Sequence, residues 1–161
     1  LESELFNAGV MPAVNPGISV SRVGGDAQIK AMKKVAGSLK LLYSQYRELQ
    51  SFAQFGSDLD ADTKARLALG ERIVAVLKQK NNAPVEVAHQ VCILYAVIGG
   101  YLNDLSVAQV PEFEKALHKF MEEKHFDVLS AIRQSGKLEA ATEEMLKNAL
   151  SDLRKEFVIE I

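Results

Sequence analysis

Apolar residues in most of the chain recur every three or four positions, which is the period of an amphipathic α-helix. The first such face begins after Asp26, a residue type that caps helix N-termini, and continues to a stop at Gly56. At 1.5 Å per residue this helix would be roughly 40 Å long. Its apolar positions are Ile29, Met32, Val35, Ala36, Leu39, Leu42, Tyr43, Tyr46, Leu49, Phe52 and Ala53. Basic residues occupy the opposite, solvent-facing side: Lys30, Lys33, Lys34, Lys40 and Arg47.

The same periodicity predicts further helices with clear start and stop signals. Asp60 has the position of a helix cap, Gly99-Gly100 lies near a helix end, and Ser106 and Pro111 mark another start. The predicted helices cover about 60–80, 87–99, 111–124, 126–136 and 139–157. Because the connections between them are short, neighbouring helices should lie antiparallel in a compact bundle.

Residues 1–25 differ in composition from the rest of the chain, since they contain four of the ten glycines and two of the four prolines. Between Pro16-Gly17 and Gly24-Gly25, the segment 18–23 alternates with period two and is typical of a single β-strand. A lone strand is not stable by itself, and the chain opens without an initiator Met, so we expect a fragment. The predicted fold is mainly α, a helical bundle over 26–161 preceded by a short strand and loop remnant of another domain over 1–25.

Composition narrows the possible functions. The 161 residues are 48% apolar and 25% charged, which is typical of a soluble globular protein and excludes a disordered, collagen-like or disulfide-rich chain. A net charge of −2 leaves no excess positive charge for a nucleic-acid backbone or an anionic membrane, so we expect no nucleic-acid partner. No stretch approaches ~20 consecutive apolar residues, so membrane association would be indirect. Cys92 lies in an apolar run and is interpreted as a buried small hydrophobe.

Motifs of an independent enzyme are missing from the sequence. Neither the P-loop pattern G-x-x-x-x-G-K-[ST] nor G-x-G-x-x-G occurs, and no G-x-S-x-G accompanies the serines. His89, His118 and His125 have no metal-ligand spacing with Cys92, so no metal site is predicted.

Arg22 is the residue that points to phosphate chemistry. It ends the predicted strand, and ligands of open α/β sheets gather beyond the carboxyl ends of strands. A guanidinium there presents a permanently charged fork to phosphate oxygens. The alternative is an ordinary surface or ion-paired arginine, because nothing else in this chain could hold the phosphate. Such a site would have to be completed by another polypeptide.

Five stretches of the sequence resemble a known family. They are LFNAG (5–9), PAVN (12–15), GISVSRVGG (17–25), QIKAMK (28–33) and FAQFGSDLD (52–60). Together they are similar to the carboxyl-terminal third of the alpha subunit of F-type rotary ATP synthases, and the likeness continues to about Phe157. The resemblance implies that residues 1–25 end a nucleotide-binding domain and that 26–161 form the C-terminal helical domain.

The resemblance also implies roles for individual residues. Arg22 would be an arginine finger that reaches the nucleotide of a neighbouring beta subunit, with Ser19, Val20 and Ser21 positioning it. Such a charge beside the γ-phosphate raises the rate of phosphoryl transfer by roughly 10³ to 10⁵ in finger-dependent enzymes.

A second set of residues would contact the adenine of the alpha subunit's own regulatory nucleotide: Pro12, Gln79 and Asn81. Met11 stands where the family usually has an arginine, and Asn81 where a second glutamine is common, so these contacts are expected to be altered. The nucleotide would be ATP or ADP with Mg in the full-length subunit, and none is expected for the fragment alone.

The partners implied by the resemblance are the beta subunit, further alpha and beta copies in a hexameric ring, and the gamma subunit of the central stalk, which the turn Ser57-Asp58-Leu59-Asp60 would face. The complex would lie peripherally on the cytoplasmic face of a bacterial inner membrane or on the equivalent organelle membrane. Two alternatives stay open. One is a free-standing helical protein-interaction module, with Arg22 incidental, and the other is an independent small hydrolase.

Overall fold

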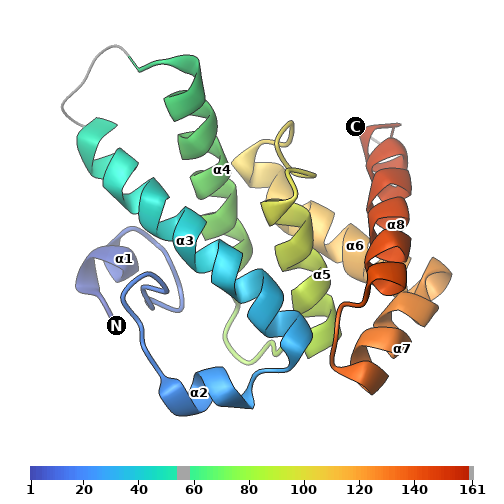
Figure 1. The fold of residues 1–161 in the computed structure, drawn as a ribbon. Coiled ribbons are helices and arrows are strands. Elements are labelled where there is room, and N and C mark those ends of the chain that lie inside the picture. The colour runs from blue at the N-terminus through green and yellow to red at the C-terminus, as the bar shows by residue number, and fades with distance from the viewer. Residues whose placement is uncertain (54–58, 160–161) are drawn as a thin grey trace.

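The structure is a computed structural model that describes residues 1–53 and 59–159. Its helices follow one another along the chain as α1 (Ser3–Asn7), α2 (Arg22–Ala27), α3 (Lys30–Ala53), α4 (Ala61–Leu77), α5 (Val87–Ile98), the 3₁₀ turn η1 (Val107–Gln109), α6 (Val110–Lys124), α7 (Phe126–Ser135) and α8 (Ala140–Ile159). Figure 1 shows α3 and α4 side by side, α5 packed against both, and α6, α7 and α8 grouped at the other end of the molecule. The prediction of a mainly helical bundle is confirmed.

Local signals place the helices from α4 to α8 close to where the sequence predicts them. The Asp60 carboxylate accepts a hydrogen bond from the Thr63 N–H at 2.9 Å and starts α4. The Gln109 side chain accepts from the Ser106 N–H at 2.9 Å, which fixes the entry into η1 and α6. Gly136 ends α7 in the left-handed conformation, with φ of 63°. Each of these contacts spans four residues or fewer, so the sequence pattern captures it.

The prediction of one long first helix from Asp26 is wrong. The Ser21 hydroxyl accepts a hydrogen bond from the Gly24 N–H at 2.9 Å, so a short helix α2 begins at Arg22 and contains Asp26. Gln28 then adopts an extended conformation, and α3 begins only at Lys30. The predicted stop at Gly56 lies outside the described residues.

The predicted strand over 18–23 is also absent. No strand occurs within residues 1–53 and 59–159, so the segment has no partner there with which to form a ladder. Its β-branched side chains are left in solvent, with Val20 87% and Val23 81% exposed. Instead, the hydrogen bond that the Ser21 hydroxyl accepts from the Gly24 N–H caps a helix, and Arg22 and Val23 form the first residues of α2.

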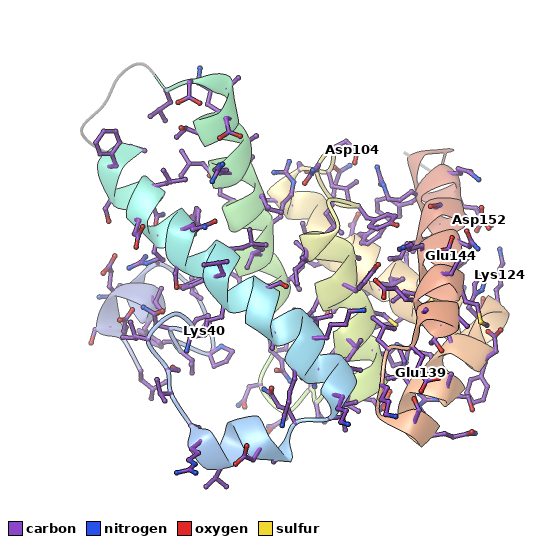
Figure 2. The ribbon with its side chains drawn as sticks, in the orientation of Figure 1. Lys40, Asp104, Lys124, Glu139, Glu144 and Asp152 are labelled. Carbon is purple, nitrogen blue, oxygen red and sulfur yellow. The ribbon has the colours of Figure 1, made fainter. Side chains whose placement is uncertain are left out.

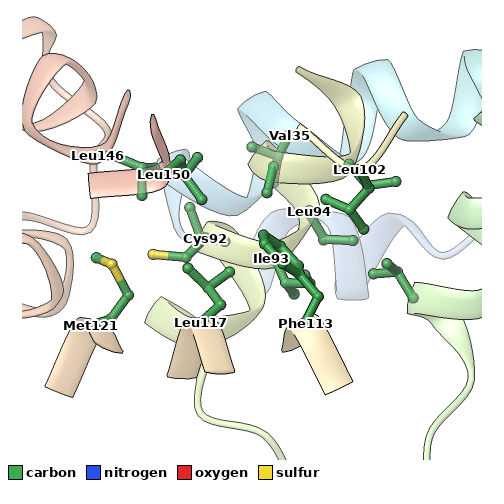
Figure 3. Close-up of a cluster of buried hydrophobic side chains, with 14 of the residues drawn as sticks. Val35, Cys92, Ile93, Leu94, Leu102, Phe113, Leu117, Met121, Leu146 and Leu150 are labelled. Carbon is green, nitrogen blue, oxygen red and sulfur yellow. The ribbon is translucent and has the colours of Figure 1, made fainter. Parts of the chain in front are cut away.

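The hydrophobic core is centred on α5, whose side chains are buried on nearly every face. Figure 3 shows Cys92 of α5 between Leu150 of α8 and Leu117 of α6. Cys92 is fully buried, and this burial raises the pKa of its thiol to about 12. Its interpretation as a small hydrophobe is confirmed, because a thiol with that pKa remains protonated at neutral pH.

Two histidine rings in tilted contact join α5 to α6. The ring centroids of His89 and His118 lie 4.6 Å apart, and His89 Nε2 lies 2.8 Å from Glu122 Oε1. Burial, and secondarily the neighbouring His89, lower the pKa of His118 from 6.5 to about 4. Neutral His118 is therefore the form that the folded chain favours.

This lowered pKa predicts acid sensitivity of the fold. Because the unfolded chain binds the His118 proton more tightly, the associated stability is complete above pH 6.5 and falls as the pH drops towards 4. With allowance for the partly exposed ring, the loss between pH 7 and pH 5 should be about 1 to 2 kcal/mol. Urea unfolding at pH 7 and pH 5 measures this loss of stability in the parent chain and in the His118→Gln variant. An equal loss of stability in the variant would show that His118 is not responsible.

Candidate functional site

Arg22 lies on the open surface at the first turn of α2. The guanidinium makes no ion pair and no hydrogen bond with any residue of 1–53 or 59–159. Val20, two residues earlier, is likewise exposed, and Ser21 supplies the cap that starts the helix. The structure thus places the predicted finger residue at the start of a helix and not at the end of a strand, with its charge free to meet another molecule.

The turn that leads to Arg22 is organised by Asn15. The Asn15 side-chain oxygen accepts from the Gly17 N–H at 2.9 Å, while its carbonyl accepts from the Ser19 N–H at 3.0 Å and the Ser19 hydroxyl at 2.7 Å. The Asn15 amide donates to the Glu2 carboxylate at 3.1 Å. These bonds hold residues 15–19 as one compact turn.

This turn is bonded to α3 through a lysine. Lys40 Nζ donates to the Ser19 carbonyl at 3.1 Å. In Figure 2, Lys40 is labelled on the part of α3 along which the N-terminal segment runs. The sequence pattern assigned Lys40 only to the solvent-facing side of the helix, and no local signal relates it to a residue 21 positions earlier.

Two of the predicted adenine residues meet at the end of α4. The Met11 carbonyl accepts a hydrogen bond from the Gln79 N–H at 2.9 Å, which brings Pro12 next to Gln79. The Gln79 side-chain amide donates to the Ala83 carbonyl at 2.9 Å. Asn81 follows in the exposed turn between α4 and α5.

An apolar pocket lies beside this junction, between the N-terminal segment and the helices α3 and α4. Its volume is about 140 Å³, which is room for a single ring and well below the roughly 300 Å³ of a typical small-molecule site. The lining residues are Val10, Pro12, Val14, Pro16, Tyr43, Val74 and Leu77. Arg22 is not among them, so the structure does not unite the two predicted sets of site residues.

Metal clusters and membrane-spanning helices are two other features that could indicate a function. In the part of the chain that the structure describes, no group of three or more His, Cys, Asp and Glu side chains has a metal-binding arrangement. Among the same residues, no helix combines the length and apolar character needed to span a bilayer.

Comparison with known proteins identifies the family. The family model described as "ATP synthase alpha/beta chain, C terminal domain" matches residues 28–153. The chain is 60% identical over 133 residues to the sodium-ion-specific ATP synthase subunit alpha of Acetobacterium woodii, which covers 83% of this chain and 26% of that protein. It is 52% identical over 159 residues to the ATP synthase subunit alpha of Syntrophomonas wolfei, which covers 99% of this chain and 32% of that protein. The chain spans about a quarter to a third of the length of these curated relatives. It therefore belongs to the ATP synthase alpha/beta chain family, whose C-terminal domain it contains, and is similar to the carboxyl-terminal part of the alpha subunits.

Proposed function

We propose that this chain acts as part of an alpha subunit in the catalytic head of an ATP synthase, where ATP synthesis and hydrolysis are coupled to ion translocation. Support comes from the match of the C-terminal domain family over residues 28–153 and from the high identity to two alpha subunits. The sequence has no P-loop, so the phosphates would be held by other parts of the assembly. The nucleotide is ATP or ADP with Mg, bound in the full-length subunit.

Within this assembly, Arg22 serves as an arginine finger for the nucleotide site of a neighbouring beta subunit. The observation that carries this proposal is the exposed guanidinium at the start of α2, which has no ion partner in the described residues. An unpaired, permanently charged fork can stabilise the charge that develops on the γ-phosphate in the transition state. Val20 and Ser21 position it, Ser21 by capping α2 through the Gly24 N–H.

A regulatory nucleotide would place its adenine near Pro12, Gln79 and Asn81. The backbone hydrogen bond from the Gln79 N–H to the Met11 carbonyl supports this placement, because it brings Pro12 next to Gln79. The Gln79 amide would have to leave the Ala83 carbonyl to contact a base.

The proposed partners are beta subunits, further alpha subunits of the same ring, and the gamma subunit of the central stalk. Of the turn proposed to face the stalk, Ser57 and Asp58 lie outside the described residues, and Asp60 is used as the cap of α4. The proposed location is peripheral, on the cytoplasmic face of a bacterial inner membrane or the equivalent organelle membrane, with attachment through the complex.

The isolated chain should bind nucleotide very weakly. Without a phosphate-binding loop, its dissociation constant for Mg-ATP is expected to exceed about 1 mM in a calorimetric titration. Tight binding or turnover by the isolated chain would contradict this proposal and favour an independent hydrolase. The arginine-finger role itself is tested by replacing Arg22 in the assembled enzyme.

A further inference from the structure

We propose that Lys40 of α3 is a positioning residue for Arg22, which acts through its hydrogen bond to the Ser19 carbonyl. This inference depends on the proposed role of Arg22 and extends it to the helical domain. Lys40 itself touches no nucleotide in this proposal, since its ammonium group is engaged with the backbone of the turn. Its effect is on where the segment 19–22 lies.

The first support is the face of α3 on which Lys40 lies. Positions 40, 43, 44 and 47 have the i, i+3, i+4, i+7 spacing of one helix face. Each contacts the N-terminal segment: Tyr43 lines the pocket beside Pro12, Ser44 Oγ would lie 3.0 Å from a Cβ placed on Gly17, and Arg47 pairs with Glu4 at 3.4 Å. Of the contacts made by these four residues, that of Lys40 lies closest to Arg22, because Ser19 is only three residues before Arg22 in the sequence.

The second support is the short connection between the residue that Lys40 contacts and Arg22. Ser19 is bonded to Asn15 through both its N–H and its hydroxyl, so the carbonyl that Lys40 contacts belongs to a closed turn. Val20 is the one residue between this turn and Ser21, which caps α2. A shift of α3 would therefore be passed to the turn at Ser19 and onwards to the start of α2, where Arg22 lies.

The hydrogen bond of Lys40 can affect where the turn at Ser19 lies without being needed for folding. The Lys40 side chain is exposed, and an exposed bond of this kind adds little to stability. The rate of a reaction assisted by an oriented charge, in contrast, is sensitive to displacements of about 1 Å. Lys40→Met should therefore assemble normally and still react more slowly.

The test uses the assembled ATP synthase with full-length alpha subunits carrying Lys40→Met, and single-turnover hydrolysis, in which slow rates remain measurable. We expect a roughly three- to tenfold lower rate with the KM for ATP nearly unchanged, because orientation affects the transition state more than ground-state binding. Lys40→Arg should restore most of the rate, since a guanidinium can also donate to the Ser19 carbonyl. In an Arg22→Ala background, Lys40→Met should cause no further loss.

Lys30→Met is the matched control, because Lys30 also lies on α3, is exposed, and makes no ion pair with the residues that the structure describes. Its rate should equal that of the parent enzyme. The positioning role is wrong if Lys40→Met behaves like Lys30→Met, or if it slows the Arg22→Ala enzyme by the same factor as the parent. Full activity of Arg22→Ala alone would instead contradict the finger role, so the two failures are distinguishable. If Lys40→Met assembles poorly, Lys40→Gln provides the same comparison.

Discussion

Replacing Arg22 with alanine in the assembled ATP synthase is expected to lower the rate of ATP hydrolysis by roughly 10³-fold or more. The guanidinium is exposed at the start of α2 and unpaired within the described residues, so the substitution removes a charge without disturbing a contact of the fold. In phosphoryl transfer, that charge acts mainly on the transition state, and the KM for ATP should change much less than kcat. Steady-state and single-turnover hydrolysis measure the two effects separately.

Two variants serve as controls for this experiment. Arg22→Lys keeps the charge and loses the planar fork, so its rate should lie between those of the parent and of Arg22→Ala. Arg66→Ala removes an exposed arginine of α4 that pairs with Asp62 within the same helix, and its rate should remain that of the parent. Undiminished hydrolysis by Arg22→Ala would refute the finger role and favour the interpretation of the chain as an interaction module with an incidental arginine.

The second large effect is expected at Gly70, where α4 meets α3. A Cβ placed on Gly70 would lie 2.0 Å from Cδ2, 2.1 Å from Cγ and 2.6 Å from Cβ of Tyr46. Both residues are buried, so the ring has no free space into which to move. Gly70→Ala should therefore force the two helices apart and lower the free energy of unfolding by about 2 to 4 kcal/mol, despite the better helix propensity of alanine.

Gly37 provides the matched control, because it lies inside α3 and a Cβ placed there meets nothing within 4 Å. Gly37→Ala should stabilise the chain by about 0.5 to 1 kcal/mol in the same urea titration. In a Tyr46→Ala background, the loss caused by Gly70→Ala should shrink, since the ring atoms are removed. A Gly70→Ala variant as stable as Gly37→Ala would mean that the helices do not approach as closely as the structure shows.

The helical part of the fold was largely predictable, because its signals act over a few residues. The caps at Asp60, Ser106 and Gly136 and the apolar spacing of α5 and α6 each depend on neighbours within a turn or two. The same reasoning failed over 18–23, where alternation predicted a strand, and at Asp26, where it predicted the start of the first long helix. A strand needs a partner strand, which local patterning cannot supply. Without one, the capping hydrogen bond of Ser21 determined the helical conformation that begins at Arg22.

The candidate site divides in the same way. The prediction of phosphate chemistry comes from the residue type of Arg22 and from the motif around it. The structure adds that the Gln79 N–H donates to the Met11 carbonyl, which brings Pro12 next to Gln79. The hydrogen bond from Lys40 to the Ser19 carbonyl was not predictable, since an exposed lysine on a helix has the same pattern whether or not it bonds a distant carbonyl.

By itself, then, the amino-acid sequence determined the family through its motifs. It also determined the helical class and the approximate boundaries of α4 to α8, because capping and periodicity are properties of short segments. Only the tertiary structure decided that Gly70 receives the ring of Tyr46, that the N-terminal segment lies along α3, and that Lys40 holds the turn before Arg22. These contacts join residues far apart in the chain, and they form only when packing of the helices brings distant segments together.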